Sequence, residues 1–312
     1  MRLLTNAAAR EPVGDWPLPE RYQYLGPIGA GGMSSVCNVR DLDLLRCVAM
    51  KILGQEPAQN PENVKRFVRE AQITAELDHP NIVPVYERGQ DRHGNYYFTM
   101  KRVDGQTLAE WIDAVGRPTA TAASLRQMLA AVAKVCDGLA FAHSRRVLHC
   151  DVKPENIMVG SFGQAYLMDW GVACSLDERP KAAWLPVQIP ARDDPAMPLF
   201  RGGLNGTPAF MAPEQAFGYR HLVDERTDVF GLGTVLYTIL TGRPPFRGSS
   251  ITEVISEARA CAITFAGGDT GEPLPAELCR IASKAMARER HGRYQSVLDL
   301  QRALQAAMDA AE

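Results

Sequence analysis

The sequence has no paired cysteines. Its seven cysteines are scattered and none belongs to a C-x-x-C motif; they occupy positions 37, 47, 136, 150, 174, 261 and 279. This spacing argues against a zinc site and against a disulfide framework. We therefore expect a protein of a reducing compartment, with a cytoplasmic location.

Strong charge and long apolar runs are also missing. The formal net charge is −2, which gives no sign of a nucleic-acid partner or a membrane surface. No apolar stretch reaches the roughly 18 residues that span a bilayer, so we expect no membrane segment in this chain. The first apolar run is interrupted by Thr5 and Asn6, which argues against a signal peptide.

Length and composition are those of an ordinary globular protein. With 312 residues, 46% hydrophobic and 22% charged, the chain is long for one core, so two lobes are the natural expectation. Residues 1–20 contain Pro12, Pro17 and Pro19 and show little periodicity. We expect them to form an extended N-terminal arm.

A short polar stretch at residues 149–156 is the most informative part of the chain. It reads HCDVKPEN and lies between the apolar residues 147–148 and 157–159, an arrangement typical of catalytic side chains on a rigid core. Asp151 could accept a proton, Lys153 could neutralise a phosphate and Asn156 could bind a hard cation. These roles require a nucleotide site elsewhere in the sequence.

The first hundred residues alternate short strand-like runs with turns. We expect one helix at residues 62–77 and strands at residues 22–28, 36–39, 47–53, 82–86 and 96–103. The glycine-rich turn between the first two strands could bring N–H groups to a phosphate, although such turns are common between strands. Lys51 in a strand and Glu70 on the helix are either surface charges or partners in an ion pair. The pattern predicts an α+β lobe.

From Asp104 onward the pattern is helical. We expect helices at residues 125–143, 224–240, 276–287 and 295–311. Ser124 is a candidate N-cap for the first helix, with Gln127 three residues later to complete a capping box. The second helix is mostly apolar all round, which is the pattern of a buried helix.

Taken together and in this order, these motifs resemble the eukaryotic-type protein kinase family, and in particular its bacterial serine/threonine branch. The resemblance covers residues 21–310. It implies an α+β, two-lobed fold with a small β-rich N-lobe containing one helix and a larger helical C-lobe. The N-lobe would be residues 21–103 and the C-lobe residues 104–312, with the activation segment at residues 169–214.

The resemblance implies an ATP site with most of its residues in the N-lobe. Lys51 matches the lysine that contacts the α- and β-phosphates, and Glu70 matches the glutamate that orients it. Met100 matches the gatekeeper, residues 101–103 match the hinge, and Asp104 matches the residue near the ribose. The implied nucleotide-binding residues are Ile28, Gly29, Ala30, Gly31, Gly32, Val36, Ala49, Lys51, Met100, Lys101, Val103, Asp104 and Met158.

The implied catalytic motifs lie in the C-lobe. Asp151 matches the base or orienter of the substrate hydroxyl, and Lys153 the contact to the γ-phosphate. Asn156 and Asp169 match the ligands of Mg²⁺, with Mn²⁺ as an alternative metal. The implied platform for the protein substrate is Thr207, Ala212, Pro213 and Glu214. Two further matches are structural, with Asp228 anchoring the catalytic loop and Arg293 pairing with Glu214.

The sequence departs from the family pattern at three positions. Ser34 replaces the third glycine of the loop, so we expect weaker but not absent nucleotide binding. Trp170 replaces the phenylalanine of D-F-G, which we expect to change packing only. Cys150 replaces the arginine that pairs with a phosphorylated activation loop, and Ser175 is the single hydroxyl-bearing residue in 172–206. We therefore expect activation without activation-loop phosphorylation.

The predicted activity is transfer of the γ-phosphate of ATP to serine or threonine hydroxyls of proteins in signalling, including autophosphorylation. The hydroxyl preference rests on Lys153 and Thr207. Two alternatives stay open: a pseudokinase scaffold, favoured by the substitutions Ser34 and Cys150, and a small-molecule phosphotransferase. The A-P-E motif at residues 212–214 argues against the second. We expect residues 181–203 to be an insertion folded on the C-lobe, with partner docking or groove occlusion as the alternative. No feature indicates an oligomeric state, and the chain could be a domain of a longer protein.

Overall fold

The computed structural model describes residues 18–115, 122–176, 207–265 and 274–310. The chain divides into two compact units. The smaller comprises the residues up to Ala71 together with Val85–Arg102, and the larger comprises Gln72–Pro84 and the residues from Val103 onward. The sequence-based division placed residues 72–84 in the smaller unit. They cluster with the larger one because Ile73, Leu77 and Ile82 pack in its core.

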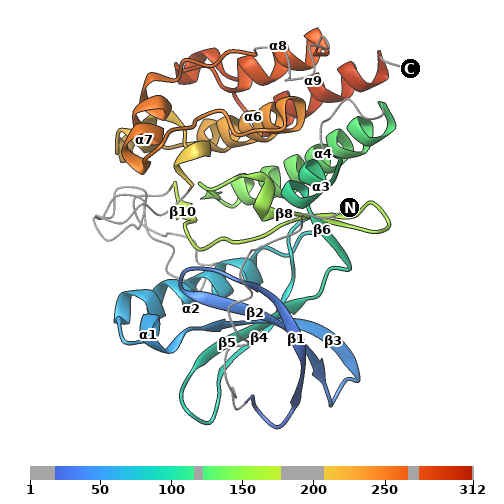
Figure 1. Ribbon diagram of the computed structural model, residues 1–312, viewed down its shortest axis with the longest axis vertical. Helices are drawn as coiled ribbons and strands as arrows, with labels where there is room; N and C mark the ends of the chain where they lie inside the picture. Colours follow the sequence, from blue (N-terminus) through green and yellow to red (C-terminus); the bar gives the residue numbers. More distant parts are fainter. Residues whose placement is uncertain (1–17, 116–121, 177–206, 266–273, 311–312) are drawn as a thin grey trace, which may run out of the picture. The chain divides into compact units, whose positions relative to one another are not determined.

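The smaller unit is built on one antiparallel sheet with strand order β1-β2-β3-β5-β4 (Figure 1). Its strands are β1 (Tyr22–Ala30), β2 (Ser34–Asp41), β3 (Arg46–Leu53), β4 (Val85–Gln90) and β5 (Tyr96–Lys101). A short helix α1 (Gln55–Ala58) leads into the long helix α2 (Pro61–Glu76).

The two faces of this sheet carry separate hydrophobic clusters. Because side chains alternate along a strand, Val48, Met50 and Ile52 of β3 lie on one face. Leu53 of β3 lies on the opposite face and packs with Phe67 and Ala71 of α2. Helix α2 therefore covers the face to which the odd-numbered residues of β3 belong.

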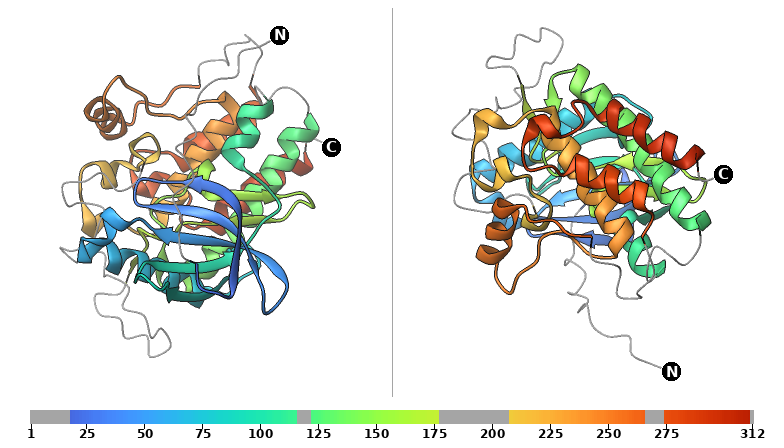
Figure 2. Two further views of the ribbon diagram at one scale, coloured as in Figure 1. Left: turned by 60° about the horizontal axis from the view of Figure 1, so that its bottom comes forward. Right: turned by 90° about the horizontal axis from the view of Figure 1, so that it is seen from above.

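The larger unit is mainly helical (Figure 2). Its helices are α3 (Leu108–Val115), α4 (Ala122–Ser144), α5 (Pro213–Ala216), α6 (Glu225–Thr241), α7 (Ile251–Ala260), α8 (Ala276–Ala285) and α9 (Val297–Asp309). Its short strands are β6 (Gly105–Thr107), β7 (Val147–Leu148), β8 (Ile157–Gly160), β9 (Ala165–Leu167) and β10 (Cys174–Ser175). Single 3₁₀ turns are η1 (Pro154–Asn156), η3 (Pro208–Phe210), η4 (Arg220–Leu222) and η5 (Arg290–Gly292).

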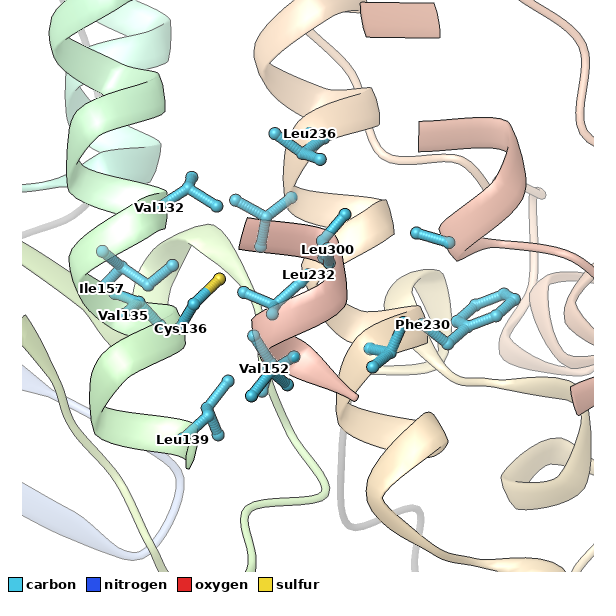
Figure 3. Close-up of a cluster of buried hydrophobic side chains, with 14 of the residues drawn as sticks. Val132, Val135, Cys136, Leu139, Val152, Ile157, Phe230, Leu232, Leu236 and Leu300 are labelled. Atoms are coloured by element: carbon cyan, nitrogen blue, oxygen red, sulfur yellow. The ribbon is translucent and has the colours of Figure 1, made fainter. Parts of the chain in front are cut away.

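Helix α6 lies at the centre of this unit and packs against α4, α8 and α9. Figure 3 shows side chains of α4, such as Val132, and of α6, such as Leu232, filling the space between the two helices, with Leu300 of α9 nearby. Asp224 caps α6 by accepting a hydrogen bond from the Arg226 N–H at 2.9 Å. The packing of these helices in the interior of the unit therefore fixes the positions at which their connecting loops begin and end.

The structure confirms the expected fold class, an α+β smaller unit and a helical larger unit, and corrects several details. The strand predicted at residues 82–86 runs instead from Val85 to Gln90, and Ile82 forms an isolated parallel bridge with Leu167. Helix α4 begins at Ala122, so Ser124 lies inside it and is not its N-cap. Helices α1, α3, α5 and α7 were not predicted. Residues 1–17 and 181–203, for which an arm and an insertion were predicted, lie outside the described residues.

Candidate active site

In the smaller unit, Lys51 and Glu70 form an ion pair. The Lys51 Nζ lies 2.5 Å from the Glu70 Oε1, and the two side chains are 15% and 11% exposed. The pair forms because Lys51 belongs to the face of β3 that α2 covers, and α2 presents Glu70 there beside Phe67 and Ala71. A lysine held in this way keeps its ammonium in a fixed position, which suits the binding of a phosphate group.

The glycine-rich turn is shorter than predicted. Strand β1 continues to Ala30 and β2 starts at Ser34, which leaves residues 31–33 as the turn. The turn is closed by a hydrogen bond of 2.8 Å from the Gly31 N–H to the Ser34 carbonyl. Ser34 pairs with Leu53 of β3 and is not among the described residues with positive φ. Serine adopts this extended backbone without strain, so the reason for expecting weaker nucleotide binding does not apply.

The other candidate nucleotide-binding residues occupy the middle strands or follow them. Val36 lies opposite Gly29, and Ala49 lies opposite Met100. Lys101 ends β5, and Val103 and Asp104 follow it. Ile28 is 51% exposed, and Met158 belongs to β8 of the larger unit. The sheet register thus brings together two pairs of these residues within the smaller unit.

In the larger unit, Asp151, Lys153 and Thr207 form a connected cluster. The Lys153 Nζ donates to the Asp151 Oδ2 at 2.8 Å and to the Thr207 Oγ1 at 2.7 Å. The Thr207 N–H lies 3.4 Å from the Asp151 Oδ1. Thr207 lies 54 and 56 positions along the chain from Lys153 and Asp151, yet its hydroxyl and N–H meet their ammonium and carboxylate at one place.

Asn156 and Asp169 supply oxygen atoms in the same unit as this cluster. The Asn156 Nδ2 donates to the Asp151 carbonyl at 2.8 Å, which leaves its Oδ1 as the atom available to a cation. Asp169 is exposed and has a left-handed backbone with φ of 61°. No group of three or more His, Cys, Asp or Glu side chains among the described residues could hold a metal by itself. Two oxygen ligands fit Mg²⁺, which usually completes its shell with water and substrate phosphates.

Asp228 of α6 anchors the backbone of the catalytic loop, residues 149–156. Its carboxylate accepts hydrogen bonds from the His149 N–H at 2.9 Å and the Cys150 N–H at 2.8 Å, and lies 2.8 Å from the His143 Nε2. Burial alone would raise the pKa of Asp228, but the hydrogen bond from His143 and the loop amides hold that pKa below its ordinary value. Sequence reasoning found Asp228 but missed His143.

His149 connects the loop to the segment before Asp169. Its Nδ1 accepts the Asp151 N–H at 3.2 Å, and its Nε2 lies 2.9 Å from the Met168 carbonyl. An acceptor at Nδ1 and a carbonyl at Nε2 require the neutral tautomer with its proton on Nε2. The ring also contacts Trp170 edge-on, with centroids 4.7 Å apart. Trp170 is fully buried, and its Nε1–H has no hydrogen-bond partner among the described residues.

Cys150 faces an apolar cluster instead of a charged pocket. The cluster consists of Leu148, Cys150, Val172, Cys174, Leu176 and Val223. The Cys150 Sγ lies 3.4 Å from the Cys174 Sγ, because the pairing of β7 with β10 brings these strands side by side. This contact, together with burial, raises the pKa of the Cys150 thiol well above its ordinary value. Sequence reasoning did not identify Cys174 as the neighbour.

Glu214 and Arg293 form a bidentate ion pair deep in the larger unit. The two guanidinium Nη atoms lie 2.7 and 2.8 Å from the carboxylate oxygens, and the side chains are 0% and 3% exposed for Arg293 and Glu214. Thr227 donates a further hydrogen bond to the carboxylate at 2.8 Å. The pair therefore links the segment that follows Thr207 to the chain between η5 and α9.

The geometry agrees with what the comparison with known proteins finds. A family model described as the protein kinase domain matches residues 22–294. The chain belongs to the protein kinase family. The α+β two-lobed fold implied by the sequence resemblance is therefore confirmed, with the smaller unit as the N-lobe and the larger as the C-lobe.

Several bacterial kinases are similar to this kinase domain. Serine/threonine-protein kinase PknB of Mycobacterium tuberculosis is 34% identical over 287 residues, which cover 91% of this chain and 42% of that protein. PrkC of Bacillus subtilis is 32% identical over 292 residues, covering 93% and 41% respectively. PknD of Protochlamydia amoebophila is 32% identical over 299 residues, covering 89% and 29%.

The kinase domain spans less than half the length of each of these relatives. Across the described residues, no helix combines the length and the apolar character that crossing a bilayer requires. The residues with predicted catalytic roles all lie within the matched range and in the described part of the chain.

Proposed function

We propose that this kinase domain transfers the γ-phosphate of ATP to serine and threonine hydroxyls of proteins, including its own. The cluster of Asp151, Lys153 and Thr207 carries this proposal. In this cluster a carboxylate that can accept a hydroxyl proton lies beside an ammonium that can neutralise phosphate charge. The Lys153 Nζ lies 2.8 Å from the Asp151 Oδ2 and 2.7 Å from the Thr207 Oγ1. The names of the similar bacterial proteins, which are serine/threonine kinases, support the same activity.

In this proposal each side chain has a separate role. Asp151 orients the substrate hydroxyl and accepts its proton, and Lys153 stabilises the charge on the transferred group. Lys51, fixed by Glu70 at 2.5 Å, neutralises the α- and β-phosphates. Such positioning and charge neutralisation supply most of the catalysis in phosphoryl transfer, because little covalent help from the protein is required.

Asn156 and Asp169 are proposed to hold the divalent metal. Their donor atoms are hard oxygens, which is the preference of Mg²⁺ and also of Mn²⁺, and we favour Mg²⁺ because ATP is its ordinary ligand. A divalent metal held by these two residues would supply positive charge that offsets the charge of the phosphates. The hydrogen bond from Asn156 to the Asp151 carbonyl would keep the metal ligand and the proton acceptor in one fixed geometry.

We also propose that the activity does not require a phosphate on the activation segment. Cys150 takes the position of the family's arginine and lies in an apolar cluster with Cys174, so this side chain offers no positive charge to a phosphate. Ser175 belongs to β10 and is 6% exposed, so its hydroxyl is poorly accessible to another kinase molecule. A Ser175→Ala variant should keep its activity, with mass spectrometry recording any phosphate on the segment; a large loss would contradict this proposal.

A reducing, cytoplasmic location is part of the proposal. All seven cysteines lie in the described part of the chain, and all are free thiols. Cys150 and Cys174 stay unlinked although their sulfur atoms are 3.4 Å apart. Free thiols in such numbers are typical of proteins kept in a reducing compartment.

The decisive experiment measures transfer of labelled phosphate from ATP to a generic protein substrate and to the domain itself. The Asp151→Asn variant should lose about 10²–10⁴-fold in kcat, the usual contribution of a positioned acid or base. The kcat of Lys51→Met should fall by a similar factor. The exposed Asp113→Asn serves as a matched control and should retain full activity. A signal that survives Asp151→Asn would instead favour a nucleotide-binding scaffold without turnover.

A further inference from the structure

The side chain of Gln215 connects two segments that lie far apart in the sequence. Gln215 belongs to α5 and is 7% exposed. Its Oε1 accepts the Ala212 N–H at 3.0 Å, and its Nε2 donates to the Cys150 carbonyl at 2.8 Å, across 65 positions. These two partners fix the orientation of the side-chain amide. An N–H can bond only to its oxygen, and a carbonyl can bond only to its NH₂ group.

The carbonyl of Cys150 belongs to the peptide bond that leads into Asp151. This peptide is held at both ends, since its oxygen accepts from Gln215 and its N–H donates to the His149 Nδ1 at 3.2 Å. The backbone there is strained, because Cys150 has φ of 65°, a conformation that L-residues other than glycine rarely adopt. Strain of this kind persists only when surrounding contacts enforce it, and Gln215 supplies one of those contacts.

Among the described residues, Gln215 is the only hydrogen-bond donor to this carbonyl. The free space beside this carbonyl is small. The cavity lined by Gln215, Cys150, Asp151 and Asp228 has a volume of about 10 Å³. This volume has room for about one water molecule. A large rearrangement of the loop to find another donor would meet α6, where a Cβ on Gly231 would already lie 2.8 Å from the Cβ of Val152.

We propose that Gln215 is a positioning residue that sets the peptide plane before Asp151 and couples it to the protein-substrate platform. The coupling follows because the same amide holds the N–H of Ala212, the first residue of the A-P-E motif. This inference rests on the proposed phosphotransfer function. It predicts that loss of the amide displaces the proton acceptor relative to the bound hydroxyl, and a displacement of 1 Å can reduce turnover about 10²-fold.

Two variants separate positioning from mere support of the fold. Gln215→Met keeps the length and removes both hydrogen bonds, so kcat should fall about 10–100-fold with the KM for ATP within about twofold of wild type. The exposed Gln106→Met and Gln106→Glu are matched controls in strand β6 and should match wild type. A role limited to fold stability would lower the unfolding temperature of Gln215→Met and leave kcat at permissive temperature unchanged, which would overturn the proposal.

Gln215→Glu provides a readout that depends on pH. A neutral carboxyl group has an O–H donor for the Cys150 carbonyl and an oxygen for the Ala212 N–H, whereas the ionised form can only accept. The titratable groups around the cavity are Cys150, Asp151 and Asp228, and the Arg259 Nε binds the carbonyl of the next residue, Ala216. Burial and the two nearby carboxylates raise the pKa of the introduced group. The ratio of its kcat to that of wild type should therefore be highest at low pH and fall as pH rises; a ratio independent of pH would count against the proposal.

Amide hydrogen exchange tests the positioning even in a protein without turnover. In Gln215→Met, the N–H groups of Ala212 and Asp151 should exchange at least tenfold faster than in wild type, and in Gln106→Met they should not. If wild type transfers no phosphate but this acceleration appears, the function is wrong and the positioning is right. If wild type is active and neither kcat nor the exchange of these amides changes in Gln215→Met, the positioning role is refuted and the function stands.

Discussion

Replacing Glu214 by glutamine should destabilise the C-lobe more than any exposed charge change. The substitution removes the negative charge that neutralises Arg293. Of the two guanidinium N–H groups that bind the carboxylate, one then faces the NH₂ group of the glutamine, which cannot accept a hydrogen bond. Both side chains are almost fully buried, at 3% and 0% exposure. Water therefore cannot replace the lost interaction, and the guanidinium is left as an uncompensated buried charge.

The size of the effect follows from the contacts of Arg293. Besides Glu214, its guanidinium donates to the carbonyls of Ala287, Arg226 and Arg288 at 2.8 to 3.1 Å, and it lies 4.8 Å from the ring of Phe230. These contacts hold the cation in place after its partner is gone. Breaking a buried ion pair of this kind costs about 3–5 kcal/mol. For a unit of this size that cost lowers the unfolding temperature by about 6–20 °C.

The assay is thermal and urea-induced unfolding of wild type, Glu214→Gln and a matched control. The control is Glu277→Gln, because Glu277 pairs with Arg280 at 2.5 Å on the surface, with side chains 54% and 61% exposed. We expect no measurable shift for the control. The double variant Glu214→Leu with Arg293→Met should recover part of the loss, since no charge is left unpaired. A Glu214→Gln midpoint as close to wild type as that of the control would refute the reasoning.

Three further predictions concern the residues around the catalytic loop. Trp170→Phe should stay within about 1 kcal/mol of wild type in urea unfolding, because relief of an unpartnered buried N–H offsets the lost ring volume; a loss above about 3 kcal/mol would show that the N–H is satisfied. Cys150→Arg should lower the unfolding temperature strongly, because it buries a cation in an apolar cluster, whereas Cys150→Ser should have a smaller effect; equal effects would argue against the apolar character of the site. Asp228 has a lowered pKa, so its contribution to stability is complete above its unfolded pKa of about 3.9 and is lost as pH falls through the folded value. Urea unfolding between about pH 3 and 6 should therefore show a steeper acid limb for wild type than for Asp228→Asn, and identical limbs would contradict the assignment.

Local patterns were sufficient where a residue's role depends on its own element. Lys51 in an apolar strand and Glu70 near the apolar face of a helix could be predicted as partners, and they lie 2.5 Å apart. The central helix was predicted from its apolar composition within one residue of its ends at Glu225 and Thr241. Both cases rely on the periodicity of side chains, which is a property of the sequence itself.

Two missed helices carried a signal that could have revealed them. Helix α3 follows Thr107, whose hydroxyl accepts the Glu110 N–H at 3.1 Å while Glu110 binds the Thr107 N–H at 2.8 Å. Helix α7 follows Ser250, which caps the Glu253 N–H in the same way. Each is a capping motif with a glutamate three residues after a hydroxyl. For Ser124 the same kind of motif misled, since α4 begins two residues earlier.

The remaining features depend on contacts between distant segments. Cys174 is ordinary in sequence and acquires meaning only because β10 pairs with β7 beside Cys150. Gln215 directly follows the A-P-E motif and has no pattern of its own, and its partner Cys150 lies 65 positions away. A sequence pattern of short range carries no information about such pairs, because the sheet register and the packing of α6 determine them.

The link from the catalytic loop to Asp228 has a consequence for biosynthesis. The His149 N–H binds a carboxylate that comes 79 residues later in the chain. At the usual rates of translation, the ribosome needs about 4–16 s to add that many residues. The loop that bears Asp151 is therefore synthesised before its anchor exists, and its geometry can form only after α6 has docked. A nascent or truncated chain that ends before α6 would contain the residues of the proposed phosphoryl transfer without their arrangement, so the proposed activity would arise only late in the synthesis of the domain.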